Sequence, residues 1–468
     1  STQAKTLFPY TTLFRSAVRR HGAGAGSLDR PGSQHMGMMN LQQALDWIRQ
    51  SIPQARLVGD GATPVARVHT DTRTLQPGDL FVALKGERFD ANAFLADARD
   101  AGAVAAVAHG GLEAAGLPGI EVPDSLAALG ALATAWRAQF SLPLIGITGS
   151  NGKTTTKELV SRVLAEKYEV YATRGNLNNH IGVPLTLLAM TRDVEFGIVE
   201  MGASACGEIA LLCSIAEPNY GIVTNIGRAH LEGFGGPEGV RRGKGELYDW
   251  LARTGGRVFV PANDPVLMSM AAERETLAAE CYPTTLADGV EHHLEGDYNR
   301  FNVAAAVAVG RYFGVDDERI RYAVGSYRPD NHRSQKIRTG QNTLILDCYN
   351  ANPSSMQASL VNFRQEPLEG CTRKILILGD MLELGDWSDA EHRHIISLAA
   401  EIPDARILLV GPHFAKAYRS LESRPADTTL YPSQEVLAAE LRKHPVSQAL
   451  ILVKGSHSIG LERLADLL

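Results

Sequence analysis

The sequence predicts an α/β protein with three domains: a small α/β N-terminal domain, a central domain on a parallel sheet, and a C-terminal Rossmann-like domain. Three observations support this prediction. The chain has 468 residues, which is too long for one hydrophobic core. Apolar, strand-like runs alternate with helix-like segments over residues 141–333, a pattern typical of parallel strands joined by crossover helices. A second series of the same kind fills residues 334–468.

The composition is that of an ordinary globular protein. Hydrophobic residues make up 44% of the chain and charged residues 21%, both typical values. The net charge is −6, so the chain lacks the overall positive charge that would favour nucleic-acid binding. The sequence contains no run of about 18 apolar residues, so a membrane-spanning helix is not expected. The five cysteines are odd in number and include no C-x-x-C pair. Buried thiols in a reducing cytoplasm are therefore expected, with no disulfide framework or zinc site.

Residues 1–39 differ from the rest of the chain. They show no sustained periodicity, and Gly32–Met36 resembles a vector or protease-site scar. They also lack the apolar stretch of a signal peptide. We therefore expect this segment to lie outside the native fold.

The N-terminal domain is expected over residues 40–140. Asn40 precedes an amphipathic helix, and the apolar run Val65–Val68 predicts a strand. Further short strands and a helix over 91–102 follow. Asp71 and Arg73 lie in a polar loop that could hold a nucleotide head group, although such a loop taken alone is usually solvated.

The central domain begins with a phosphate-binding pattern. An apolar run, Leu142–Ile147, leads into a glycine-rich turn and a helix-like segment, which together describe a P-loop ATPase-like domain. Glycines let backbone N–H groups approach phosphate oxygens, and the helix adds its positive end. A chance turn with an exposed lysine is the alternative. The residues expected to bind the nucleotide are Gly149, Ser150, Asn151, Gly152, Lys153, Thr154 and Thr155.

The turn departs from the general P-loop pattern at one position. The pattern G-x-x-x-x-G-K-[ST] requires glycine where Ile147 stands. Lys153 is still expected to reach the β- and γ-phosphates, and the Thr154 hydroxyl is expected to bind Mg²⁺.

Polar side chains follow several strands of the predicted central sheet. Glu200 ends one strand, His230 lies in the loop after another, and Lys244 lies on a later helix. Ligand sites gather at the carboxyl ends of parallel strands, and a carboxylate suits a hard cation. His230 would be an unusual magnesium ligand and a structural role is the alternative, while Lys244, taken alone, is expected on the surface.

Two asparagine pairs flank these positions. Asn178 and Asn179 precede an Ile-Gly-Val-Pro turn. Asn299 and Asn302 lie on one face of an Ala-rich helix, where they could bind an adenine edge or substrate, or cap the helix. A Pro- and Asn-rich joint at 327–333 predicts the second domain boundary.

The C-terminal domain repeats the arrangement of strand followed by polar loop. The strand Thr343–Leu346 ends at Asp347, and Asn350 and Asn352 follow in a loop before a helix. A second strand leads to Gly-Asp-Met-Leu-Glu-Leu-Gly at 379–385. No G-x-G-x-x-G is present, so a nicotinamide dinucleotide is not predicted.

The motifs taken together resemble the Mur ligase family. They occur in the family's order and cover nearly the whole chain from about residue 40: TDTRTLQPGDLFVALKGERFD, GITGSNGKTTT, GNLNNHIGVPLT, VEMGA, TNIGRAH, RGKGEL, DYNRFNVAAAVA, LDCYNANPSSM, LGDMLELG and LVKGS. The last four and the first look most like the members that join D-alanyl-D-alanine to a UDP-N-acetylmuramoyl-tripeptide. The resemblance implies an ATP- and Mg²⁺-dependent amide ligase that forms an acyl phosphate, has small-molecule substrates and is a cytoplasmic monomer.

The resemblance also implies residue roles. Catalytic roles are implied for Lys153, His230, Lys244 and Arg333. Metal binding is implied for Thr154, Glu200, His230 and a carbamylated Lys244. Nucleotide contacts are implied for Asn299, Asn302, Arg333 and Asp347. Substrate contacts are implied for Asp71, Arg73, Asn178, Asn179, Asn350 and Asn352.

Two positions depart from the family pattern. The chain has Asp90-Ala91-Asn92 where Asp-Gly-His is common, which puts a uridine contact from Asn92 in doubt, and Asn331-His332 precedes Arg333 where glycine is common. The alternatives are another amide ligase of the superfamily, a nucleotide switch or kinase, and a non-catalytic ATP-binding module. A common GTPase should show N-K-x-D, which the chain lacks.

Overall fold

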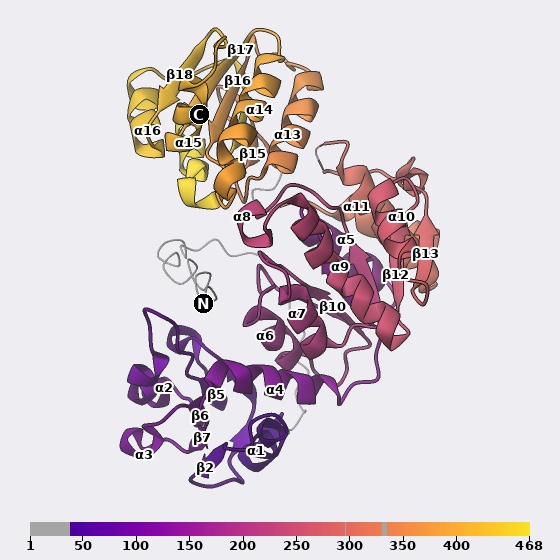
Figure 1. Cartoon of the computed structure of the whole chain (residues 1–468), viewed down its shortest axis with the longest axis vertical. Coiled ribbons are helices and arrows are strands. Elements are labelled where there is room, and N and C mark those ends of the chain that lie inside the picture. The colour runs from indigo at the N-terminus through magenta and orange to yellow at the C-terminus, as the bar shows by residue number, and fades with distance from the viewer. Residues whose placement is uncertain (1–37, 295, 330–334) are drawn as a thin grey trace. The chain divides into compact units, whose positions relative to one another are not determined.

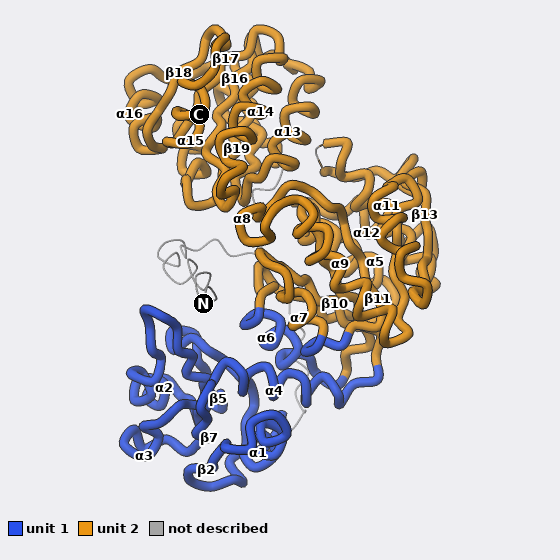
Figure 2. The backbone as a smooth tube through the Cα atoms, viewed as in Figure 1, with its two compact units in different colours: residues 1–141, 180–192, 214–217 blue, residues 142–179, 193–213, 218–468 orange. Residues whose placement is uncertain are grey.

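The computed structural model describes residues 38–294, 296–329 and 335–468. The chain forms two compact units (Figure 2). One unit comprises the chain up to Ser141 together with residues 180–192 and 214–217, and the other comprises the remainder. Of the tag-like segment expected over 1–39, residues 1–37 lie outside the described residues, as do residues 330–334 with Arg333 in the expected joint. The boundary expected after residue 39 is wrong, because Met39 is buried and pairs with Val65 in a short ribbon.

The first unit is built on a five-stranded sheet with the order β2-β7-β6-β5-β4, in which only the β2–β7 pair is antiparallel. Its strands are β2 (Arg56–Val58), β4 (Arg67–His69), β5 (Asp79–Val82), β6 (Ala105–Ala108) and β7 (Gly119–Glu121). A separate ribbon pairs β1 (Met39–Asn40) with β3 (Pro64–Val65). Its helices are α1 (Leu41–Arg49), α2 (Leu95–Asp100), α3 (Leu112–Ala115), α4 (Ser125–Arg137) and α6 (Gly182–Leu188).

Local chemistry explains the ends of these elements and two differences from expectation. Asn40 caps α1 in a reciprocal capping box with Gln43, so the predicted helix is confirmed. The single strand expected over Val65–Val68 is wrong: β3 and β4 pair with different partners, and the Ala66 N–H between them donates to Gly78. The helix expected over 91–102 is also divided, because Asp90 caps a short 3₁₀ turn before α2 begins.

The middle of the chain forms a six-stranded, wholly parallel sheet with the order β13-β12-β11-β8-β10-β9. Figure 1 labels its strands β10, β12 and β13. The strands are β8 (Leu144–Thr148), β9 (Val170–Ala172), β10 (Phe196–Glu200), β11 (Tyr220–Val223), β12 (Arg257–Pro261) and β13 (Ala278–Tyr282). The connecting helices are α5 (Lys153–Ala165), α7 (Glu208–Ala216), α8 (Leu231–Phe234), α9 (Pro237–Thr254), α10 (Pro265–Ala272), α11 (Asn299–Tyr312) and α12 (Asp317–Ser326).

This sheet is buried on both faces, which explains the near-continuous apolar runs of its strands. Side chains of α5, α11 and α12 pack with the strands in one core cluster that includes Ile147, Val160 and Val303. Helices α9 and α10 contact β11 and β12. The predicted central parallel sheet is therefore confirmed.

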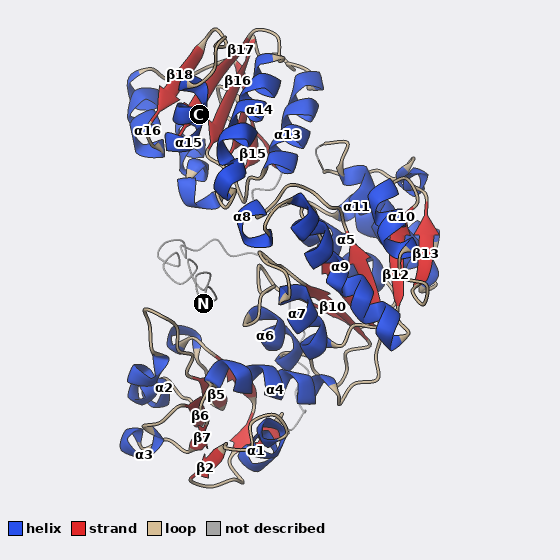
Figure 3. Ribbon diagram, in the orientation of Figure 1, coloured by secondary structure: helices blue, strands red, loops and turns tan. Residues whose placement is uncertain are grey.

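The last sheet has the order β14-β15-β19-β16-β17-β18, and only the β14–β15 pair is antiparallel. Its strands are β14 (Gln335–Arg338), β15 (Thr343–Asp347), β16 (Arg373–Gly379), β17 (Ala405–Val410), β18 (Thr428–Tyr431) and β19 (Ala449–Lys454). Helices α13 (Pro353–Gln365), α14 (Ser388–Ala400) and α15 (Pro412–Arg419) share one core cluster with the sheet, and α16 (Gln434–Lys443) belongs to another. Figure 3 draws these helices beside the strands. The predicted Rossmann-like fold is confirmed.

None of the helices in the described part of the chain combines the length and apolar character that a membrane crossing requires.

Candidate functional site

The glycine-rich turn follows β8, the strand between β10 and β11. Gly149 has φ +138°, and a Cβ added there would lie 2.0 Å from the Oγ1 atom of Thr224. Gly152 has φ +78°, and its added Cβ would lie 2.7 Å from the Oδ1 atom of Asn302. Both positions therefore require glycine, for conformation and for space.

Two residues at the end of β11 fix the shape of the turn. The Ser150 N–H donates to the Asn225 carbonyl, and the Asn151 N–H donates to Asn225 Oδ1, each at 3.1 Å. The Thr224 hydroxyl donates to the Asn151 carbonyl at 2.5 Å. Neither residue was assigned a role of its own from the sequence. Their position directly after a strand adjacent to the turn is the signal that could have identified them.

Helix α5 begins at Lys153, directly after the turn. The N–H groups of a first helical turn lack partners within the helix and, with the helix dipole, favour an anion. The Lys153 ammonium donates to the carbonyls of Gly149 at 2.8 Å and Ser150 at 3.3 Å. Its positive charge therefore lies over the same turn.

Thr154 and Glu200 meet at the adjacent ends of α5 and β10. The Thr154 hydroxyl donates to Glu200 Oε2 at 2.9 Å, and the Asn178 amide donates to Oε1 at 2.9 Å. Glu200 is 1% exposed, and its backbone N–H donates to the Thr173 hydroxyl. The structure thus brings three of the predicted site residues together around one buried carboxylate.

This oxygen-rich pair fits Mg²⁺, which prefers hard oxygen ligands and keeps several waters or phosphate oxygens. Within the described ranges, no group of three or more His, Cys, Asp or Glu side chains could hold a metal ion by itself. A magnesium ion here would therefore take most of its ligands from nucleotide and water.

Lys244 lies inside the protein, so the surface position expected for it alone is wrong. The side chain is 1% exposed; its ammonium donates to the Ala203 carbonyl at 3.1 Å and lies 5.1 Å from the centre of the Phe234 ring. Burial, and next the nearby charge of Lys153, lower the pKa of Lys244 well below its usual value. Both effects act against the charged form of the amine.

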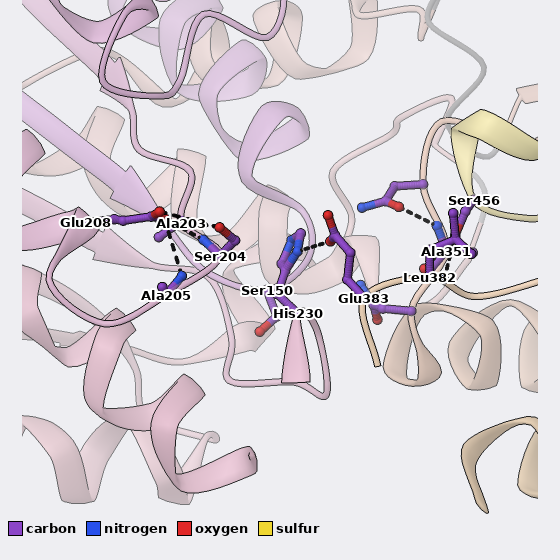
Figure 4. Close-up of polar contacts among 12 residues, drawn as sticks. Ser150, Ala203, Ser204, Ala205, Glu208, His230, Ala351, Leu382, Glu383 and Ser456 are labelled. Carbon is purple, nitrogen blue, oxygen red and sulfur yellow. Dashed lines mark hydrogen bonds and ion pairs between the residues drawn. The ribbon is translucent and has the colours of Figure 1, made fainter. Parts of the chain in front are cut away.

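His230 has a left-handed backbone, with φ 52°, at the start of α8. Its Nδ1 atom pairs with Glu383 Oε2, from the loop after β16 (Figure 4). The imidazole holds the pKa of the Glu383 carboxyl below its usual range. Glu383 lies within the Gly-Asp-Met-Leu-Glu-Leu-Gly motif but was not assigned a role from the sequence.

Asn299 and Asn302 form a buried pair next to the turn. The Asn302 amide donates to Asn299 Oδ1 at 2.8 Å, and the Thr156 hydroxyl donates to Asn302 Oδ1 at 3.0 Å. The residue in the N-cap position of α11 is Tyr298, without a side-chain cap. The pair thus connects α11 to α5 and does not act as a helix cap.

Asp347 lies at the end of β15 and forms an ion pair with Lys454 at 2.5 Å, while the Ser359 hydroxyl donates to the same carboxylate oxygen at 3.0 Å. The adjacent cavity has a volume of about 10 Å³ and is lined by Tyr298, Ile345, Asp347, Ser359, Asn362, Phe363 and Leu452. It holds about one water.

Asn352 caps α13 by accepting from the Ser355 N–H at 2.9 Å, and its amide donates to Asn151 Oδ1 in the turn at 2.8 Å. The Asn350 carbonyl accepts from the Lys454 ammonium at 3.3 Å, and the Asn350 side chain accepts from the next backbone N–H. The structure therefore brings Asn352 to the glycine-rich turn through a direct side-chain contact.

The residues predicted for the uridine end lie in the first unit. Arg73 donates twice to the Asp71 carboxylate, at 2.8 and 2.6 Å, and this pairing lowers the pKa of Asp71 and raises that of Arg73. Asn92 donates to Asp90 and accepts from the His109 N–H. Asn179 precedes α6, and Arg333 lies outside the described residues.

Three family models match the chain: the Mur ligase family catalytic domain at residues 64–137, the Mur ligase middle domain at 147–285, and the Mur ligase glutamate ligase domain at 332–457. The UDP-N-acetylmuramoyl-tripeptide–D-alanyl-D-alanine ligase of Bacillus subtilis is 34% identical over 86% of this chain and 93% of its own length. The Escherichia coli enzyme of that name is 33% identical over 91% and 97%.

Solved structures agree with these matches. A crystal structure of MurF from Acinetobacter baumannii has a TM-score of 0.79 and 30% identity, covering 90% of this chain and 98% of its own. MurF ligase from Thermotoga maritima in complex with ADP has a TM-score of 0.72 and 25% identity, covering 86% and 96%. The chain therefore belongs to the Mur ligase family, in the group of the UDP-N-acetylmuramoyl-tripeptide–D-alanyl-D-alanine ligases.

Proposed function

We propose that the chain joins D-alanyl-D-alanine to the terminal carboxylate of a UDP-N-acetylmuramoyl-tripeptide, with ATP converted to ADP and phosphate, in the cytoplasmic synthesis of peptidoglycan precursors. One observation carries the proposal: the Gly149–Thr154 turn, with Glu200 hydrogen-bonded to Thr154, lies in a chain 34% identical over 86% of its length to such a ligase.

The reaction requires activation of the acid, because a carboxylate does not expel oxide when an amine attacks it in neutral water. A tripeptide carboxylate oxygen attacks the γ-phosphorus of ATP, and ADP leaves. The amine of D-alanyl-D-alanine then attacks the acyl carbon and loses a proton. The resulting tetrahedral intermediate expels phosphate, which carries the former carboxylate oxygen.

The chain's main task is to bring two anions together and align them. Lys153 and the first N–H groups of α5 would hold the γ-phosphate, with Arg333 as a further cation. Thr154 and Glu200 would hold Mg²⁺. When bound, this ion would neutralise charge that develops on the phosphoryl oxygens.

Lys244 is proposed to carry a carbamate. A neutral amine attacks CO₂ through nitrogen and loses a proton, which converts a cationic side chain into an anionic oxygen ligand. Its burial beside Phe234 and the lowered pKa support this step. Lys244 in that form, with His230, would hold a second divalent ion. Intact-protein mass after mild CO₂ trapping, compared with Lys244→Gln, would detect the modification, and an unmodified mass in both would contradict it.

The remaining predicted contacts complete the proposal. Asp71, Arg73, Asn178 and Asn179 would bind the UDP-linked substrate. Asn350 and Asn352 would bind the incoming dipeptide. Asn299, Asn302 and Asp347 would contact the nucleoside.

The test is product mass. Incubation with ATP, Mg²⁺, UDP-N-acetylmuramoyl-tripeptide and D-alanyl-D-alanine should yield one new UDP-pentapeptide per ADP released. Single amino acids, including diaminopimelate and glutamate, serve as competing acceptors. Release of ADP with a single amino acid, but not with the dipeptide, would indicate another ligase of the superfamily, while ADP release without an amide product would contradict ligase activity.

A further inference from the structure

The pair of His230 and Glu383 joins two different sheets of the same compact unit (Figure 4). His230 lies in the loop after β11, and Glu383 lies in the loop after β16. A second contact accompanies this pair, because the Glu232 N–H donates to the Glu383 carbonyl at 3.2 Å. Leu231 and Phe234 of α8 share a core cluster with Met381 and Leu384 of the loop after β16.

Both residues of the pair have a backbone that L-residues rarely adopt. His230 has φ 52° and Glu383 has φ 61°, both in the left-handed region that favours glycine. Their side chains remain 25% and 48% exposed, and an ion pair this exposed contributes little to stability. Stability does not explain why two strained residues face one another, and strain of this kind is characteristic of functional sites.

The loop that carries Glu383 is fixed by further hydrogen bonds. The Met381 N–H donates to His392 Nε2, and the Leu382 N–H donates to the Ser456 hydroxyl, each at 3.1 Å. These bonds come from α14 and from the segment after β19, so the backbone next to Glu383 is held by two different segments. Figure 4 shows Leu382 and Ser456. Such support is what a side chain needs in order to orient another group.

We propose that Glu383 is the positioning residue for His230: it accepts the Nδ1–H proton of the imidazole and so leaves the Nε2 lone pair to bind a divalent cation. The cation-binding part of this inference rests on the proposed function. The part that concerns the tautomer of His230 does not. Histidines that bind metals commonly donate their other ring N–H to a carboxylate, which sets the tautomer and the ring orientation.

The His230–Glu383 pair is assembled from two different sheets. His230 comes from the sheet that carries the phosphate-binding turn, and its orienting carboxylate comes from the last sheet. The imidazole is therefore held for cation binding only while the loop after β16 remains packed on α8.

The test uses the full-length protein with isotope-labelled histidine. NMR of the protein without metal or substrate reports which ring nitrogen of His230 carries the proton, and His230→Gln assigns the signal. The wild type should have the proton on Nδ1. Glu383→Ala should lose this preference, and Glu383→Gln, which keeps an acceptor oxygen, should retain it. A wild-type proton on Nε2, or an unchanged tautomer in Glu383→Ala, would overturn the proposal whether or not the protein is a ligase.

Binding of Mn²⁺ in the presence of ADP, followed by electron paramagnetic resonance, is the second readout. Glu383→Ala should weaken Mn²⁺ binding by about tenfold or more, with smaller loss in Glu383→Gln. Asp386→Ala, which removes an exposed carboxylate from the same loop, is the matched control and should bind as the wild type does. Equal Mn²⁺ binding by Glu383→Ala and wild type would overturn the role, while no binding by wild type with a normal tautomer would instead contradict the proposed function.

Discussion

The charged residues near the glycine-rich turn are buried or partly buried, and the carboxylates among them have specific partners. Glu200 accepts from Thr154 and Asn178, and Asp347 pairs with Lys454. A buried carboxylate is tolerated only when it is hydrogen-bonded or paired. Lys244 differs, because its partners are a carbonyl and an aromatic ring, so its environment favours the uncharged amine.

Lys153→Ala tests the electrostatic role of the turn. The substitution removes the positive charge that lies over Gly149 and Ser150, so kcat should fall on the order of 10²- to 10³-fold, as when one preorganised donor is lost. Initial rates of ADP release measure the effect. Lys443→Ala, on the exposed face of α16, is the control and should leave the rate unchanged; a Lys153→Ala rate close to wild type would contradict this role.

His392 is a buried residue whose charge state should affect stability. Its Nδ1–H donates to the Ser388 carbonyl at 2.7 Å, and its Nε2 accepts from the Met381 N–H at 3.1 Å, so both nitrogens are occupied by the neutral form. Burial lowers the pKa of His392 below its ordinary value of 6.5, although Asp380 opposes this and His413 adds to it.

The sign of the resulting pH dependence follows from proton linkage. The unfolded chain binds a proton near pH 6.5, whereas the folded chain resists it until lower pH, so stability is retained above pH 6.5 and lost as pH falls below it. Thermal midpoints measured at several pH values should therefore decrease toward acid. His392→Gln should flatten this decrease, and an equal slope in both proteins would contradict the assignment.

Some of these residue-scale features could be predicted from sequence and others could not. The association of Thr154 with Glu200 was predictable, because both follow parallel strands or turns at one edge of a sheet. The burial of Lys244 was not, since it depends on Phe234 and Ala203 from other segments. Glu383 was not assigned, because its contact with His230 spans 153 residues of sequence.

At the scale of elements, the turn between β8 and α5 is held in place by hydrogen bonds from residues that follow another strand, β11. Thr224 and Asn225, which follow β11, donate to and accept from its backbone. Strand periodicity and glycine pattern predicted β8, the turn and α5, because these signals are local. The division of Val65–Val68 between two sheets was not predictable locally, since pairing with β1 or β5 decides it.

Gly149→Ala tests the tight contact at this turn. The added Cβ would lie 2.0 Å from the Thr224 hydroxyl oxygen, at φ +138°, so the turn must deform and ATP affinity should fall at least about tenfold, as expected when a preorganised site is distorted. Isothermal titration with a non-hydrolysable ATP analogue measures it. The control is Gly340→Ala, since a Cβ there meets nothing within 4 Å; equal affinity in Gly149→Ala would contradict the requirement for glycine.

At the scale of the whole molecule, the predicted nucleotide contacts come from different sheets. Lys153 follows β8 and Asp347 ends β15, and the cavity beside Asp347 has a volume of only about 10 Å³. The fold class and the succession of α/β regions along the chain could be predicted, because each sheet has its own series of strand and helix signals in the sequence. The arrangement of the segments during the reaction could not, because it depends on ligands.

We predict that the protein changes shape when ATP analogue, Mg²⁺ and both substrates bind, because an acyl phosphate must be protected from water. Small-angle scattering with and without the ligands should show a changed radius of gyration. The same data give the mass in solution, which should be that of a monomer. An unchanged radius under saturating ligands would count against closure.

The central claim is that an acyl phosphate forms from the tripeptide carboxylate, and transfer of a heavy oxygen isotope tests it most directly. The terminal carboxylate of the UDP-linked tripeptide is labelled in both oxygens, and the phosphate released with D-alanyl-D-alanine and ATP is analysed by mass spectrometry. The account predicts one labelled oxygen in each phosphate released, in step with amide formation. Amide product accompanied by unlabelled phosphate would contradict it.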